Sequence, residues 1–323
     1  NSVTHFERSV QRRRVHLVSF SPETDYISGL AVNDWYGSRQ RGTRGSLQRR
    51  GRPLSSHTHT RTQIGMRIKM TGQEVPDMTY RVLGRTGLSV SRVGLGAGGP
   101  SRLGVSKGGD SGNVERLVRL AVDLGINLID TARAYGTEDA LGHALSSVKE
   151  QMYVATKVRC YATPDVTDPH QDPIVDPGHI TTSVEESLRA LQRDTIDILQ
   201  LHAVTAPGLA PTIEHLVPAM IKLREQGKVR FLGITEHPGI DPHQEMATRA
   251  CESGVFDTLM LQYSIFDQQA ERGTFAAARE QDVGLFCMCA ARGACTSPAA
   301  LRQVLALCAP DDDASLDFLL EGE

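Results

Sequence analysis

The chain has 323 residues, a formal net charge of −3 at pH 7, and a hydrophobic fraction of 40%. This length is compatible with two average domains or with one α/β barrel that carries an extension. The sequence contains no run of about 18 apolar residues, the length that a transmembrane helix needs. We therefore expect a protein that does not enter a membrane.

Charge divides the chain into two parts. Residues 1–78 hold 13 Lys and Arg against 6 Asp and Glu, whereas the remainder has a net charge of −10. The first part is rich in Arg and Ser and keeps no period of 2 or 3.6, so it buries too little apolar surface to offset chain entropy. An Arg-rich targeting peptide and a nucleic-acid-binding tail are open alternatives. We predict a disordered extension over residues 1–78, a folded part over 79–323, and no nucleic-acid partner.

The cysteines favour a reducing compartment. The six cysteines are Cys160, Cys251, Cys287, Cys289, Cys295 and Cys308. They form no C-x-x-C pair and lack the density of a disulfide scaffold, which is typical of a cytoplasmic protein. Cys287 and Cys289 alternate along a strand-like run, and core packing explains them better than metal binding. We predict no metal site.

From residue 79 the sequence becomes regular. Two short strand-like runs, 80–83 and 88–90, flank a turn bounded by Gly84 and Gly87, which predicts a β-hairpin. Seven βα units follow. The expected strands are 93–95, 126–129, 152–155, 196–201, 231–234, 258–261 and 283–288, and the helix after each is 114–124, 138–148, 183–191, 213–225, 244–251, 270–279 and 298–307.

Alternating strands and helices predict a parallel sheet with right-handed crossovers. No strand leads through G-x-G-x-x-G into a helix, which argues against a Rossmann dinucleotide site. The fold class that fits is α/β, a (β/α)8 TIM barrel preceded by a β-hairpin and incomplete because the eighth βα unit is missing. We expect the first and seventh strands to expose unpaired edges, and we interpret the chain as a fragment of a longer sequence.

Polar residues end three of these strand-like runs. Asp130 follows the second run, Lys157 lies just beyond the third, and His202 directly follows the fourth, while Tyr135 comes five residues after Asp130. The C-terminal ends of the strands converge at the functional face of a parallel α/β barrel. We therefore expect these four side chains to meet.

The same residues carry a resemblance to a known family. The sequence resembles the aldo-keto reductase superfamily in the motifs Asp130-Thr131-Ala132-Arg133-Ala134-Tyr135-Gly136-Thr137-Glu138, Ala155-Thr156-Lys157, Leu199-Gln200-Leu201-His202 and Gly227-Lys228-Val229-Arg230-Phe231-Leu232-Gly233-Ile234-Thr235, all in order. The resemblance covers about residues 79–320. It implies a barrel that binds NADP(H) without a Rossmann fold and interconverts carbonyl groups and alcohols. It also implies a catalytic tetrad of Asp130, Tyr135, Lys157 and His202.

The chemistry of carbonyl reduction explains these residue types. The oxygen that forms after hydride transfer must be protonated, and a free tyrosine, with a pKa near 10, is a reluctant acid. A neighbouring ammonium, Lys157, favours the phenolate, and a neutral His202 can orient the carbonyl oxygen. Each residue alone has a structural alternative, such as a buried ion pair or a packing aromatic. Their joint occurrence favours the catalytic interpretation.

The expected cofactor contacts are less complete. By resemblance they come from Gly96, Ala97, Asp130, Thr235, Gln262 and Arg292. The family has a Ser-Asn pair after the fifth strand, where this chain has Thr235-Glu236, and an ionised Glu offers only acceptors. The basic residues that read the adenosine 2′-phosphate follow the eighth strand in the family, which this chain lacks. We therefore expect weak cofactor binding.

Three functional hypotheses remain open. The first is an NADP(H)-dependent oxidoreductase acting on a small carbonyl or sugar-like substrate, with Tyr135 as the general acid and base. The second is a nicotinamide-binding regulatory or sensor protein on the same fold. The third is an inactive fragment.

Overall fold

The computed structural model describes residues 28–32, 69–70, 73–74, 77–99, 101–109, 111–148, 150–162, 174–237, 240–264, 267–290 and 301–302. Every named strand and helix within these ranges belongs to one compact unit, residues 27–292. The expected helix at 298–307 and the candidate cofactor residue Arg292 lie outside the described residues, apart from residues 301–302.

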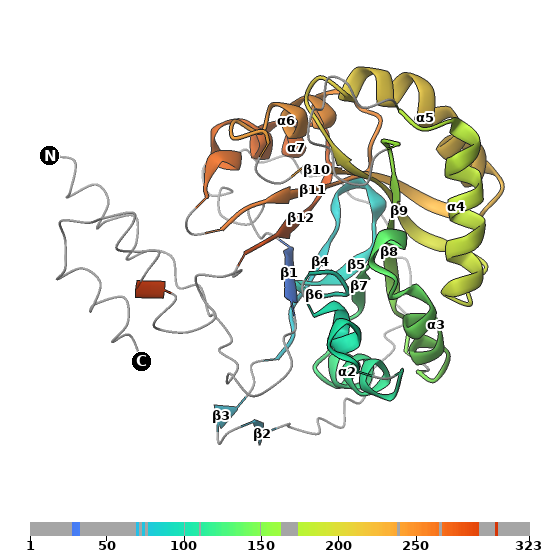
Figure 1. Cartoon of the computed structure of the whole chain (residues 1–323). Helices are drawn as coiled ribbons and strands as arrows, with labels where there is room; N and C mark the ends of the chain where they lie inside the picture. The colour runs from blue at the N-terminus through green and yellow to red at the C-terminus, as the bar shows by residue number, and fades with distance from the viewer. Residues whose placement is uncertain are drawn as a thin grey trace, which may run out of the picture. The chain divides into compact units, whose positions relative to one another are not determined.

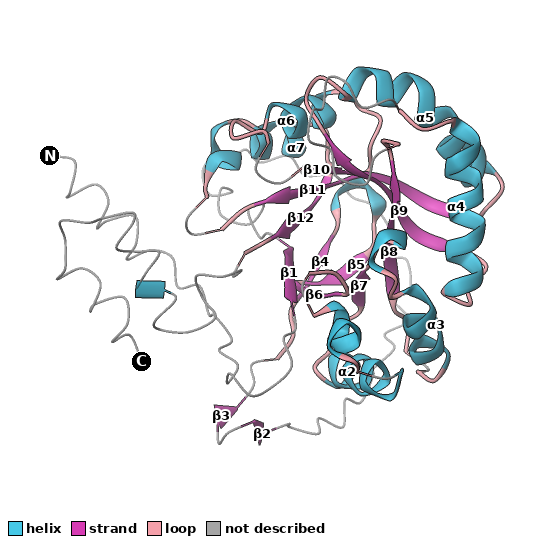
Figure 2. Cartoon of the chain, viewed as in Figure 1, coloured by secondary structure: helices cyan, strands magenta, loops and turns pink. Residues whose placement is uncertain are grey.

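Seven parallel strands alternate with helices, as the sequence predicts. The strands are β6 (Val93–Gly96), β7 (Leu128–Asp130), β8 (Tyr153–Arg159), β9 (Ile196–Val204), β10 (Val229–Glu236), β11 (Thr258–Gln262) and β12 (Gly284–Met288). The helices between them are α2 (Ser111–Asp123), α3 (Glu138–Ser146), α4 (Pro177–Ala190), α5 (Leu209–Glu225), α6 (Glu245–Glu252) and α7 (Thr274–Glu280). The strands curl around a common centre and the helices lie outside them (Figures 1 and 2). This arrangement confirms the α/β barrel assignment.

The central strands β8 and β9 are buried on both faces, as is typical of parallel sheets. In β9 the first six residues are all buried, and β8 is buried over residues 154–158. Such strands need helices on one face and a filled barrel interior on the other. The register pairs Lys157 with Gln200 and Arg159 with His202, so polar residues of the two strands lie at the same level.

Most strands extend beyond their expected ends, and two of these extensions concern candidate site residues. The sequence pattern ends the third and fourth strands before Lys157 and His202, but both residues lie inside their strands, β8 and β9. The β8–β9 ladder continues to the pair Arg159 and His202. Backbone hydrogen bonding thus continues each strand past its expected end, because the barrel interior at this level accepts polar side chains.

The barrel closes differently from the expected open seam. A strand of the leading segment, β1 (Ser28–Val32), pairs antiparallel with both β6 and β12, and the strand order becomes β1-β12-β11-β10-β9-β8-β7-β6 (Figure 1). An antiparallel strand from the leading segment thus occupies the eighth position of the barrel, between β12 and β6. Open edges carry unpaired N–H and C=O groups, and an extended segment satisfies them. Apart from β1, the domain boundary at residue 78 stays a prediction. Two further short strands lie before it, β2 (Lys69–Met70) and β3 (Gln73–Glu74), and they pair with each other.

The expected hairpin closes the N-terminal end of the barrel. It consists of β4 (Tyr80–Val82), the 3-10 turn η1 (Gly84–Thr86) and β5 (Ser89–Ser91). Its apolar residues Leu83, Leu88 and Val90 pack in one cluster with interior residues of the strands, among them Phe286 and Ile198. The turn needs glycine at position 84, where φ is +45° and a Cβ would lie 2.3 Å from the backbone nitrogen of Gly284.

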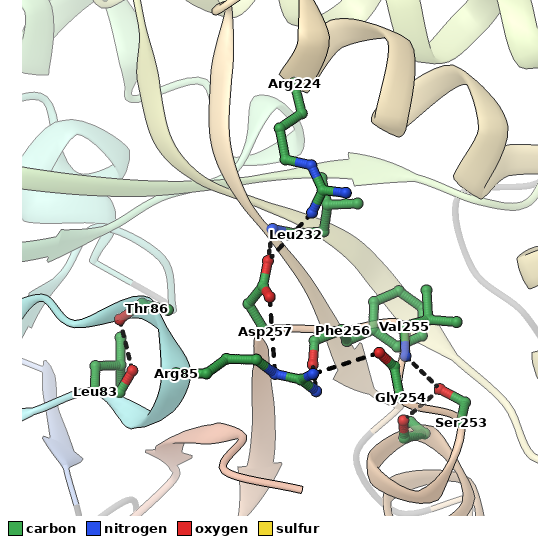
Figure 3. Close-up of polar contacts among 11 residues, drawn as sticks. Leu83, Arg85, Thr86, Arg224, Leu232, Ser253, Gly254, Val255, Phe256 and Asp257 are labelled. Carbon is green, nitrogen blue, oxygen red and sulfur yellow. Dashed lines mark hydrogen bonds and ion pairs between the residues drawn. The ribbon is translucent and has the colours of Figure 1, made fainter.

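Polar contacts tie this hairpin to the strands. The Arg85 side chain donates to the carbonyl of Phe256 at 2.8 Å and lies 3.8 Å from the Asp257 carboxylate. Figure 3 shows Asp257 between Arg85 and Arg224, with its Oδ2 accepting from the Leu232 amide at 2.9 Å. One carboxylate therefore joins the hairpin, β10 and α5.

Among the described helices none is both long enough and apolar enough to cross a membrane.

The role of Asp257 can be tested by unfolding. Asp257→Ala leaves the Leu232 amide without its acceptor and removes two ion pairs, so we expect a loss of about 1–3 kcal/mol. The control is Glu115→Ala, which breaks the exposed pair between Glu115 and Arg119 in α2 and should cost far less, because exposed ion pairs contribute little to stability. Urea unfolding measures both. Equal losses in the two variants would contradict this role.

Candidate active site

The structure brings the four predicted residues together at the C-terminal ends of three neighbouring strands. Asp130 is the last residue of β7, Lys157 lies in β8 and His202 in β9. Tyr135 ends the 3-10 turn η3 (Arg133–Tyr135) that follows β7. Because β7, β8 and β9 are adjacent in the sheet, residues far apart in sequence meet at one end of the barrel.

A buried ion pair lies at the centre of this site. The Lys157 ammonium is 2.5 Å from Asp130 Oδ2 and also donates to the backbone carbonyl of Thr131 at 2.8 Å. The exposed fractions of Lys157 and Asp130 are 2% and 5%. Charges with so little access to water need partners on every side. The second carboxylate oxygen, Asp130 Oδ1, accepts from the side-chain amide of Gln200 at 3.0 Å.

The electrostatics keep Lys157 charged. Burial by itself lowers the pKa of Lys157, but the charges of Asp130 and Tyr135 and their hydrogen bonds outweigh it and raise the pKa above its ordinary value. The pair therefore holds a fixed positive charge next to the phenol. This charge can stabilise negative charge that develops next to it during a reaction.

Tyr135 lies between the other members of the site. The Lys157 ammonium is 5.0 Å from the centroid of its ring, and the His202 ring meets it edge-on, with 5.8 Å between centroids and an interplanar angle of 82°. The ring packs on the backbone at Gly98, where a Cβ would lie 2.6 Å from Tyr135 Cε2. Tyr135 and His202 are only partly buried. They are thus the members that a substrate can reach.

His202 is neutral at ordinary pH. Burial, together with the charges of Lys157 and His237, lowers the pKa of His202 to about 3. A neutral imidazole donates a hydrogen bond from one ring nitrogen only. It can therefore polarise a carbonyl oxygen without competing with tyrosine as the strong acid.

Two residues of this site lay outside the predicted tetrad. Gln200, fully buried, holds the second oxygen of Asp130, and its own Oε1 has no hydrogen-bond partner in the described part of the chain. Glu138, also buried, accepts from Thr156, the neighbour of Lys157, at 2.7 Å and lies 3.5 Å from Arg133 in η3. A signal for Gln200 was present in the sequence, since it stands two positions before His202 and so shares its strand face.

The expected cofactor residues line up along the same end. Gly96 pairs with Asp130, and the Ala97 amide donates to the Asp130 carbonyl at 2.8 Å. Thr235 Oγ1 accepts from the Ala203 amide at 2.8 Å, which leaves its own proton available to donate. Gln262 ends β11. The assignment of these residues to a cofactor stays a prediction.

Two shielded polar atoms adjoin Gln262. Glu236 Oε2 and Gln244 Oε1 are buried and have no hydrogen-bond partner among the residues that the structure describes. Buried polar atoms of this kind are rare and generally mark a missing partner. A group with both donors and acceptors, such as a carboxamide, fits this donor and acceptor set.

Within the described residues, no group of three or more His, Cys, Asp or Glu is arranged to hold a metal ion.

Fold and site together define an α/β barrel with a tyrosine beside a buried lysine–aspartate pair. The Aldo/keto reductase family model matches residues 92–297, which is more than half of the chain. The chain therefore belongs to the aldo/keto reductase family, as the sequence motifs predict.

Individual relatives match part of their own length. The L-galactose dehydrogenase of Arabidopsis thaliana is 37% identical over 165 residues, 49% of this chain and 48% of the relative. The aldo-keto reductase YhdN of Bacillus subtilis is 30% identical over 213 residues, 64% of this chain and 60% of the relative. The matched part thus spans about half to three fifths of these relatives.

Solved structures agree with this assignment. A putative aldo-keto reductase from Pseudomonas aeruginosa matches with 30% identity and a TM-score of 0.51, covering 64% of this chain and 76% of that chain. The holo form of an aldo-keto reductase from Bacillus halodurans matches with 29% identity and a TM-score of 0.52, covering 64% and 65%.

The ion pair can be tested by a double-variant cycle. Asp130→Leu leaves an uncompensated buried ammonium, so we expect a loss of about 3–5 kcal/mol in the free energy of unfolding. The double variant Asp130→Leu, Lys157→Met removes both charges at similar volume and should recover most of that loss. Urea unfolding of the native protein, both single variants and the double variant gives the interaction free energy between the two charges. Additive losses would show that the two charges are not coupled.

The buried carboxyl of Glu236 gives a pH test of stability. Burial, with the charges of Asp241 and Asp267, raises the pKa of Glu236 to about 8, although the hydrogen bond from the Gln262 amide lowers it. An unfolded Glu loses its proton near pH 4.3. Between these values the folded state holds more protons, so Glu236 reduces stability as pH rises through this window.

Glu236→Gln removes this titration. Relative to the native protein, we expect no stabilisation at about pH 4.5 and a gain on the order of 3 kcal/mol at about pH 8.5. The matched control is Glu245→Gln in α6, whose side chain is 63% exposed, and it should show no such trend. Urea unfolding of the native protein and of both variants across this pH range measures the difference in the free energy of unfolding. A constant difference between Glu236→Gln and the native protein would contradict the raised pKa.

Proposed function

We propose that the chain is an NADP(H)-dependent oxidoreductase that interconverts a carbonyl group and an alcohol, with Tyr135 as general acid and base. The observation that carries this proposal is the placement of Tyr135 between the buried Lys157–Asp130 pair and the neutral His202. Membership of the aldo/keto reductase family supports it.

The chemistry follows from these neighbours. When bound, the reduced nicotinamide supplies a hydride to the carbonyl carbon. His202 and Tyr135 donate hydrogen bonds to the carbonyl oxygen and so orient it. As negative charge develops on that oxygen, the Tyr135 hydroxyl transfers its proton there, and the resulting phenolate is stabilised by the Lys157 ammonium. In the direction of alcohol oxidation the same phenolate accepts the proton.

Asp130 and Gln200 act indirectly, through Lys157. Asp130 balances the Lys157 charge and fixes its position, and Gln200 holds the remaining carboxylate oxygen. The cofactor contacts that we propose are Gly96, Ala97, Asp130, Thr235, Gln262 and Arg292, the last outside the described residues.

The substrate class that we propose is a small carbonyl compound or a sugar-like alcohol. The relative named L-galactose dehydrogenase supports the second possibility.

A cytoplasmic location is consistent with the four cysteines among the described residues, which are all free thiols.

Tyr135→Phe tests the proposed role of the hydroxyl. It removes the proton donor and keeps the ring, so we expect kcat to fall by about 10²-fold or more, since a general acid contributes about 10²–10⁴-fold. Affinity for NADPH should stay nearly unchanged. The measurement is NADPH consumption with a panel of aldehydes, ketones and sugars, together with cofactor binding by fluorescence.

A matched control is Tyr80→Phe. Tyr80 lies in the hairpin at the other end of the barrel and donates to the Gly125 carbonyl, so its loss should leave turnover unchanged. Tight NADPH binding without turnover on any substrate would instead support a sensor. If NADPH does not bind at all, the proposed function is wrong for this chain.

A further inference from the structure

Arg159 is an exposed cation beside the candidate active site. It is the last residue of β8, and the parallel ladder between β8 and β9 pairs it with His202. Residues that a parallel ladder pairs lie at the same level, and their side chains point to the same face of the sheet. The side chain of Arg159 therefore leaves the sheet on the side where the His202 ring meets Tyr135.

The alternation of side chains along β8 leads to the same placement. Lys157 lies two residues before Arg159, and side chains two positions apart in a strand share a face. Lys157 is 2% exposed and its ammonium lies 5.0 Å from the centroid of the Tyr135 ring, whereas Arg159 is exposed. Arg159 thus lies on the face of β8 that carries Lys157, one level closer to solvent.

The described residues supply no anion for the Arg159 guanidinium. Two other arginines hold carboxylates, since Arg133 pairs with Glu186 and Arg230 pairs with Asp197. The side chain of Arg159 forms neither a hydrogen bond nor a salt bridge with any residue that the structure describes. A guanidinium presents five N–H donors in a rigid fork that matches a carboxylate. An unpaired fork on the face of the site is therefore suited to an anionic ligand.

The charges around the site are unevenly placed. The Lys157 ammonium is balanced by Asp130, and the lowered pKa of His202 leaves its ring neutral. The acidic residues Asp241 and Asp267 act on the carboxyl at the end of β10, which β9 separates from β8. The β8 side thus offers one uncompensated positive charge among the described residues. One charge matches a carboxylate better than a phosphate monoester, which carries nearly two negative charges.

We propose that Arg159 is a specificity-determining residue that binds a carboxylate of the substrate. This inference rests on the proposed function and names its substrate class, which is a small aldehyde or sugar-like compound with a carboxylate on the carbon skeleton of the reacting carbonyl group. Tyr135 and His202 hold the carbonyl oxygen, and the guanidinium donates to the carboxylate from the neighbouring strand. Two anchors fix the orientation of the substrate, whereas a single anchor leaves it free to rotate.

The first experiment compares substrates that differ in one charge. The full chain, with NADPH, is given succinate semialdehyde or its methyl ester, and D-glucuronate or D-glucuronamide. We expect kcat/KM for each acid to be about tenfold to a hundredfold above that of its neutral partner, because charge-assisted hydrogen bonds are stronger than neutral ones. The difference should lie mainly in KM, since Arg159 binds a part of the substrate that does not react.

Variants of Arg159 show whether this side chain causes the preference. In Arg159→Gln the ratio of kcat/KM between acid and neutral partner should fall to about one. In Arg159→Lys, which keeps the charge but not the fork, the ratio should stay above one. The matched control is Arg189→Gln, which removes an exposed arginine of the outer helix α4 and should keep the native ratio. Thermal unfolding checks that each variant is folded.

A binding measurement makes the test independent of turnover. Isothermal calorimetry measures the affinity of the native chain for D-glucuronate and for D-glucuronamide. We expect the acid to bind more tightly, and Arg159→Gln to weaken its binding about tenfold or more. The affinity of Arg189→Gln for the acid should equal that of the native chain.

The outcomes separate this proposal from the proposed function. If the chain reduces the neutral partners as well as the acids, or better, the role of Arg159 is wrong and the reductase activity stands. A phosphorylated aldehyde that is preferred over both acids would overturn the choice of a carboxylate. If no carbonyl compound is reduced but D-glucuronate binding depends on Arg159, the proposed function fails and the carboxylate site stands. If D-glucuronate is neither bound nor reduced, and no other carbonyl compound is reduced, both proposals fail.

Discussion

The buried pair of Lys157 and Asp130 is the constraint on which the site depends. Two charges with almost no solvent access are stable only while they hold each other and are surrounded by further hydrogen bonds. Thr131 and Gln200 supply those bonds from β7 and β9. The geometry of three strands is thus fixed around one ammonium. Because that ammonium lies beside the Tyr135 ring, the same constraint sets the electrostatics of the phenol.

The two ends of the barrel differ in the side chains that they bury. At the N-terminal end, an apolar hairpin fills the interior and the Asp257 carboxylate joins it to the strands, while Thr258 Oγ1 is buried without a hydrogen-bond partner among the described residues. At the C-terminal end, Glu236, Gln244 and Gln200 each keep one buried polar atom that has no partner within the described part of the chain. Buried atoms of this kind are rare in proteins, and three of them at one end are consistent with a ligand that supplies the missing bonds.

Family membership and site chemistry answer different questions. The match over residues 92–297 establishes the family and the fold. It does not decide what this chain binds, because the matched part spans only about half to three fifths of its curated relatives. Burial, with the charges of Asp241 and Asp267, raises the pKa of Glu236 to about 8. The family match alone does not reveal this property, because it depends on what surrounds the carboxyl.

The sequence by itself determined the repeating βα order, the hairpin, and the convergence of Asp130, Tyr135, Lys157 and His202, because these follow from local periodicity and from the geometry of parallel strands. Tertiary structure alone decided the rest. The leading segment carries no periodic pattern, so its antiparallel pairing through β1 depends on the free edges of β6 and β12. The raised pKa of Glu236 and the contacts of Gln200 and Gln244 depend on burial and on which neighbours surround each atom. Burial and neighbours come from contacts between residues distant in the chain, which residue order does not reveal.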